Sequence, residues 1–97
     1  MEKLYVLVRT DLKGSSSAVQ AGHTVAQWML DNPVNTWNNQ TLVYINIGTA
    51  SALEQWKSKI YYKDMSYSEF KEPDLNNETT AIACLTDKKL FNGLPLL

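Results

Sequence analysis

Alternating apolar and polar stretches divide this chain into six segments and a tail. Runs rich in Val, Ile, Leu and aromatic residues are typical of β-strands, and four such runs occur, at residues 3–9, 41–47, 67–71 and 79–85. Two longer segments, residues 15–31 and 50–61, repeat instead with the three-and-four spacing of an α-helix. The predicted order is therefore strand, helix, strand, helix, strand, strand, followed by an irregular tail.

The first and last strands are the most apolar, and this predicts their place in the sheet. A strand buried on both faces is apolar throughout, so we expect residues 3–9 and 79–85 to lie side by side at the centre. The strand–helix–strand start favours parallel pairing through a right-handed crossover. The predicted fold is α/β: a single domain, residues 1–97, with a four-stranded mixed sheet and helices packed on it.

The helix boundaries and helix faces are also visible in the sequence. A serine is the candidate N-cap of the first helix, and either Thr49 or Ser51 is the candidate N-cap of the second. Around the first helix, a polar stripe that is expected to border a groove lies opposite a face of small and apolar residues. The stripe contains Ser16, Gln20, His23 and Gln27, and the opposite face contains Ala18, Gly22, Val25, Ala26 and Met29.

Composition and charge limit the class of protein. Nine basic against ten acidic residues give a net charge of −1, which counts against a strong non-specific nucleic-acid binder but still permits contact with a few phosphates. No apolar run approaches the roughly 20 residues of a membrane span, and the N-terminus lacks a signal-peptide pattern. We therefore expect a soluble, cytoplasmic protein that does not bind a membrane. The single cysteine, Cys84, is interpreted as a small buried hydrophobe.

The loop before the first helix is a candidate anion site. A strand, a small-residue loop through Gly14 and a helix start bring unpaired N–H groups and the positive end of a helix dipole together. Ser15 and Ser16 are thus candidate phosphate ligands, with Lys13 as the nearest cation. Simple helix capping by serine and a solvated surface lysine are the alternatives.

Three further side chains are candidates for catalysis. His23 carries an imidazole, which is suited to proton transfer, although by itself a helix-face histidine hydrogen-bonded to a neighbour is the simpler explanation. Asp74, after a proline and before a turn, is suited to holding water or a hydroxyl, or to accepting bonds within the turn. Thr80 opens the last strand, where its hydroxyl is a candidate oxyanion donor or a plain strand residue. Asp11 is interpreted as structural, a carboxylate that binds loop N–H groups.

Several chemistries lack their sequence signatures. One Cys and one His supply no zinc pattern, and the chain has no Walker loop, no Gly-x-Gly-x-x-Gly and no Ser-His-Asp signature. We therefore expect neither a metal nor a cofactor.

Two blocks of sequence resemble the type 2 peptidyl-tRNA hydrolase family over most of the chain. The first runs from Val8 to Lys13 and continues with Ala18, Gln20 and His23. The second consists of Glu72-Pro73-Asp74 and, after a short polar loop, Thr80-Ala81-Ile82-Ala83. The family carries a longer loop with a lysine just ahead of the helix, and that lysine falls at Ser16 here. The chain is thus similar to a compact, divergent member of the kind met in bacteriophages and bacteria.

The resemblance implies an activity and roles for the candidates. It implies hydrolysis of the ester between a peptide and the 3′ ribose of tRNA, without a cofactor. Asp74 would position water or a hydroxyl, His23 and Gln20 would hold the ribose end, and Thr80 would face the oxyanion. Ser15, Ser16 and Lys13 would hold a phosphate. The implied partner is peptidyl-tRNA, with a homodimer left open.

Two other functions fit the same sequence. One is a non-catalytic RNA- or protein-binding module on the same fold. The other is a small structural or host-interaction protein, in which the polar stripe makes only a dimer seam. Convergence of His23, Asp74 and Thr80 in space would favour the enzyme over both.

Overall fold

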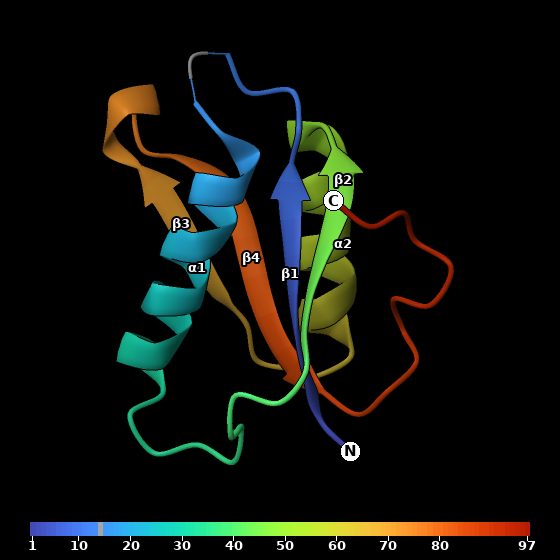
Figure 1. The fold of residues 1–97 in the computed structure, drawn as a ribbon. Coiled ribbons are helices and arrows are strands. Elements are labelled where there is room, and N and C mark those ends of the chain that lie inside the picture. Colours follow the sequence, from blue (N-terminus) through green and yellow to red (C-terminus); the bar gives the residue numbers. More distant parts are fainter. Residues whose placement is uncertain (14) are drawn as a thin grey trace.

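Four strands form one mixed sheet in the computed structural model, which describes residues 1–13 and 15–97. Gly14, where the sequence predicts a turn, lies outside the described residues. The strands are β1 (Lys3–Arg9), β2 (Leu42–Gly48), β3 (Ser68–Glu72) and β4 (Glu78–Thr86), and their order is β2-β1-β4-β3 (Figure 1). β1 pairs parallel with β2 and antiparallel with β4, which also pairs antiparallel with β3. The predicted fold class and the central position of the two most apolar strands are both confirmed.

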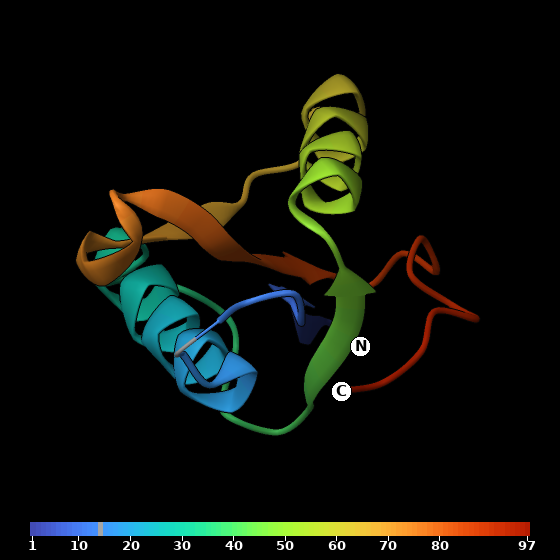
Figure 2. The same cartoon turned by 90° about the horizontal axis from the view of Figure 1, so that it is seen from above.

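Two helices cover opposite faces of this sheet (Figure 2). α1 (Ser17–Asp31) packs on β1, β3 and β4, and α2 (Ala50–Tyr62) packs on β1, β2 and β4. The side chain of Ser16 caps α1, and that of Thr49, rather than Ser51, caps α2 by accepting a hydrogen bond from the N–H of Ala52 at 3.2 Å. Neither helix is long and apolar enough to cross a membrane.

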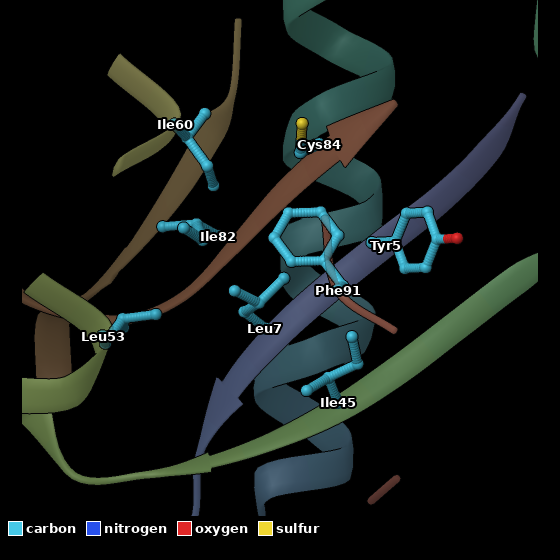
Figure 3. Close-up of a cluster of buried hydrophobic side chains, with 8 residues drawn as sticks. All are labelled: Tyr5, Leu7, Ile45, Leu53, Ile60, Ile82, Cys84 and Phe91. Carbon is cyan, nitrogen blue, oxygen red and sulfur yellow. The ribbon is translucent and has the colours of Figure 1, made fainter. Parts of the chain in front are cut away.

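The core on the α2 side extends into the C-terminal tail (Figure 3). The tail residue Phe91 is buried, with its ring centroid 5.0 Å from Tyr5 and 5.4 Å from Trp56. Eight buried side chains form this cluster, and they are Tyr5, Leu7, Ile45, Leu53, Ile60, Ile82, Cys84 and Phe91. The tail then returns along β2, where the N–H of Asn46 donates to the carbonyl of Pro95 and that of Leu97 donates to the carbonyl of Tyr44. The tail thus covers part of an otherwise open sheet edge.

The core on the α1 side is smaller and contains two indoles. Trp28 of α1 is buried, and Trp37, in the loop after α1, packs edge-on against it at 6.0 Å between centroids. The indole N–H of Trp37 donates to the carbonyl of Thr41 at 3.0 Å, so this loop is fixed to the start of β2. The remaining buried members of this cluster are Leu4, Val6, Val8, Ala21, Ala81 and Ala83.

Candidate functional site

A buried amide joins α1 to the two strands beneath it. Gln20 is 1% exposed, and its Oε1 accepts a hydrogen bond from the hydroxyl of Thr80 at 2.6 Å. Its Nε2 donates to Oε1 of Glu72 and to the hydroxyl of Ser15, both at 2.9 Å. This single side chain therefore links the loop before α1, the end of β3 and the start of β4.

The chemistry of the partners fixes the orientation of this amide. An ionised carboxylate only accepts hydrogen bonds, so the amino group of Gln20 must face Glu72. The amide oxygen then faces Thr80, whose hydroxyl must donate. None of the buried side-chain nitrogen and oxygen atoms in the described residues lacks a hydrogen-bond partner. The amide is thus a saturated junction between elements.

Two polar residues of α1 are buried, which hydrophobicity alone would not favour. Gln20 and Thr24 are buried together with Ala21 and Trp28. The hydroxyl of Thr24 donates to the carbonyl of Gln20 at 2.7 Å, which satisfies its polar group inside the helix. Gln20 of the polar stripe therefore packs on the sheet, whereas most of the small and apolar face is exposed. On that face only Val25 is half-buried, against the core on the α1 side.

The two candidate proton-transfer groups lie at the same edge of the sheet. His23 is exposed and stacks on Phe70 of β3, with ring centroids 4.7 Å apart and an interplanar angle of 14°. Asp74 is exposed in the short 3-10 turn η1 (Pro73–Leu75), which begins directly after Glu72. In Figure 1, η1 and the first turn of α1 both lie at the upper end of the sheet. Gln20 thus contacts the end of β3 and Thr80 of β4, His23 contacts β3, and Asp74 follows the end of β3.

The candidate side chains differ in their access to solvent. Thr80 is fully buried and Gln20 is nearly so, whereas His23 and Asp74 are exposed. In this arrangement only the latter two reach a ligand directly.

The three serines at the start of α1 already have hydrogen-bond partners in the protein. The hydroxyl of Ser15 accepts from Gln20, and that of Ser17 donates to the carbonyl of Arg9 at 2.8 Å. Ser16 accepts from the N–H of Val19 as the N-cap of α1. Ser16, where type 2 peptidyl-tRNA hydrolases would carry a lysine according to the sequence resemblance, thus has a structural role as a helix cap. Lys13 is exposed, and phosphate binding by Lys13, Ser15 and Ser16 stays a prediction.

A buried arginine, whose role was not predicted from the sequence, holds the end of β1. Two guanidinium nitrogens of Arg9 donate to the two carboxylate oxygens of Asp11, at 2.9 and 3.3 Å, and a third donates to the carbonyl of Thr79 at 3.3 Å. Asp11, which was expected to bind loop N–H groups, thus pairs with a side chain instead, and the N–H of Ala50 at the start of α2 adds to the lowering of its pKa. The hydrogen bond from Arg9 holds the pKa of Asp11 below its ordinary value, and the same bond raises the pKa of Arg9. The signal that the sequence offered was an arginine ending an apolar strand with a carboxylate two residues on.

Adjacent threonines at the start of β4 serve opposite faces of the sheet, as alternation along a strand requires. Whereas Thr80 meets Gln20 under α1, Thr79 donates its hydroxyl to Oε2 of Glu69 at 3.2 Å. Lys57 of α2 reaches the same carboxylate oxygen at 3.1 Å. Burial opposes ionisation of Glu69, but the bonds from Lys57 and Thr79 outweigh it and lower the pKa of this carboxyl.

Three surface hollows lie away from this cluster. One of about 440 Å³ lies along β2 and is lined by Leu42, Val43, Tyr44, Leu96 and Leu97. A second, of about 330 Å³, lies beside the C-terminal end of α1, and a third, of about 190 Å³, lies beside α2. None of them is lined by a predicted site residue, so the groove expected beside Gln20 and His23 is not among them. The described residues also contain no group of three His, Cys, Asp or Glu side chains arranged to hold a metal.

Comparison with known proteins supports the fold. No family model matches the sequence, and no curated protein matches it. A solved structure of a protein of unknown function from Agrobacterium tumefaciens strain C58 is similar, with a TM-score of 0.72 and 15% identity, over 99% of this chain and 97% of that chain. At this identity the likeness shows a shared fold.

Proposed function

We propose that this chain hydrolyses the ester that joins a peptide to the 3′ ribose of tRNA. The observation that carries the proposal is the hydrogen-bonded junction of Thr80, Gln20 and Glu72. It joins the two blocks of sequence that resemble type 2 peptidyl-tRNA hydrolases, although they are about 50 residues apart in the chain. It also leaves His23 and Asp74 exposed beside it.

The exposed groups have complementary tasks in this reaction. The carboxylate of Asp74 positions the attacking water and accepts its proton as the water oxygen bonds to the ester carbonyl carbon. His23 hydrogen-bonds the ribose and donates a proton to the 3′ oxygen as the ester bond breaks. The ring of Phe70 supports the imidazole from below. No cofactor is required, because an ester is reactive enough for one positioned water.

The buried pair has a supporting task. Thr80 has no exposed surface, and its hydroxyl is committed to the amide of Gln20. We therefore assign both as positioning residues, which fix α1 relative to β3 and so fix His23 relative to Asp74. The first turn of α1, with Lys13, Ser15 and Ser16 next to it, is the proposed contact for a tRNA phosphate.

Comparison of two carboxylate variants tests the proposal. Asp74→Asn keeps the shape of the side chain but removes the base, so peptidyl-tRNA turnover should fall by about 10²-fold or more. Asp87→Asn removes one negative charge at another exposed position and should leave turnover unchanged. Circular dichroism of both variants checks that the fold is retained. Equal turnover by Asp74→Asn and the wild type would refute the assignment of Asp74.

The burial of the junction favours a second candidate function. Because Gln20 and Thr80 use their polar atoms on each other, the same structure suits a scaffold without catalysis, a module that binds RNA or protein. Wild-type protein that binds tRNA but releases no peptide above the background rate would establish this alternative.

A further inference from the structure

The solvent side of α1 is an exposed apolar surface. Leu30 is 76% exposed, Val19 54% and Met29 45%, although side chains of this kind are normally buried in a monomer. The small side of the helix lies between them and is also exposed. We call this surface the outer face of α1, and its members are Ala18, Val19, Gly22, Ala26, Met29 and Leu30.

The outer face carries no formal charge. From Ser17 to Leu30 the helix has no Asp, Glu, Lys or Arg, and His23, at the margin of the face, is its one titratable side chain. Helices that face water normally place charged or strongly polar residues on that side. α2 does so, with Glu54 and Lys59 exposed and Lys63 exposed at its C-cap. The outer face of α1 therefore has the character of a surface that another apolar surface covers.

Residue spacing on this face fits a second helix. Val19, Gly22, Ala26 and Met29 follow one another at steps of three, four and three, which is the a/d pattern of paired helices. Small side chains at the two middle positions let a partner helix approach to about 8 Å. In Figure 2 the side of α1 that faces away from the sheet is open, which leaves room for such a partner.

The order of large and small side chains on this face indicates which helix that is. Val19 and Met29 stand at the two ends of the row and Gly22 and Ala26 in its middle, so the row has the same order of large and small side chains in both directions. A second α1 running antiparallel therefore places Val19 of each copy opposite Met29 of the other, and Gly22 opposite Ala26. We infer that the outer face of α1 pairs with the same face of a second copy of this chain, antiparallel and across a two-fold axis.

The size of the face sets the expected strength. A helix of 15 residues is about 22 Å long, and an interface of this length lies at the small end of those that hold proteins together. We therefore expect a weak dimer with a dissociation constant on the order of 1 to 100 µM. This inference is independent of the proposed hydrolase activity.

Sedimentation equilibrium over that concentration range tests the pairing. Wild-type protein should shift from monomer to dimer, whereas Ala26→Glu and Leu30→Glu, which place a charge on the outer face without disturbing the buried side of α1, should stay monomeric. Gln55→Glu adds the same charge at an exposed position of α2 and should dimerise like the wild type. A wild-type protein that stays monomeric throughout, or glutamate variants that dimerise equally well, would overturn the inference.

Disulfide trapping tests the antiparallel orientation. In an antiparallel pair centred near residue 24, position 19 of one copy faces position 29 of the other. An equimolar mixture of Val19→Cys and Met29→Cys should therefore form mixed disulfides much faster than either variant forms disulfides with itself. The native Cys84 does not interfere, because it is fully buried and burial raises its pKa to about 11. Preferential self-linking of each variant would indicate a parallel pair and contradict the proposed geometry.

Discussion

Removal of the buried bond between Gln20 and Thr80 should destabilise the fold by an amount that the structure allows us to estimate. Thr80→Val keeps the volume of the side chain but leaves the amide oxygen of Gln20 buried without a donor, which costs about 1–3 kcal/mol. Gln20→Leu leaves the Thr80 hydroxyl unpaired and also removes a bond to the Glu72 carboxylate, so we expect about 2–4 kcal/mol. Urea unfolding followed by tryptophan fluorescence measures both values.

The double variant isolates the bond itself. When both partners of this bond become apolar, neither is left buried and unpaired, while the loss of the bonds to Glu72 and Ser15 is common to Gln20→Leu and the double variant. The double variant should therefore cost about 1–2 kcal/mol less than the sum of the two single variants. Gln27→Leu on the same helix is the matched control, because its one hydrogen bond is to the exposed Asp31 and its loss should cost less than about 0.5 kcal/mol. The description of this junction would be refuted if Thr80→Val and Gln20→Leu each lowered the free energy of unfolding as little as the control does, and if their effects simply added in the double variant.

Two further predictions concern titration. Because Arg9 lowers the pKa of Asp11 below its ordinary 3.8, the ionised pair stabilises the fold above that value, and the stabilisation is lost as the pH falls through the folded-state pKa. Asp11→Asn should therefore lose less stability than the wild type between about pH 5 and pH 2, and identical acid profiles would contradict this role. Burial of Cys84, with its pKa raised to about 11, predicts that a thiol reagent at neutral pH modifies it only as fast as the protein opens, so that urea accelerates the reaction. Rapid modification of the native protein would show that this core is not closed.

The order and pairing of the strands were predictable because their signals are local. β1 and β4 are apolar along nearly their whole length, and only a central position buries both faces of such strands. The strand–helix–strand start likewise favours a single arrangement, in which the two strands are parallel and the crossover is right-handed. These features depend on residues close together in sequence, so the pattern itself carries them.

The buried face of α1 was not predictable in the same way. Gln20 is polar and was expected beside a groove, and its burial depends on Thr80 and Glu72, which are 60 and 52 residues away. Arg9 is similar, because its burial depends on the carbonyl of Thr79. The tail segment at Pro95 pairs with β2 without a strand pattern of its own. In each case a distant partner, rather than local periodicity, decides the position.

The most direct test of the proposed activity is the rate at which the wild-type protein, in excess over a peptidyl-tRNA substrate, releases free peptide in a single turnover. The proposal predicts release well above the rate in buffer alone and a return to that rate in Asp74→Asn, whose circular dichroism should match the wild type. Release by the folded wild-type protein at no more than the buffer rate would contradict the proposal and leave the non-catalytic binding module as the function that this fold supports.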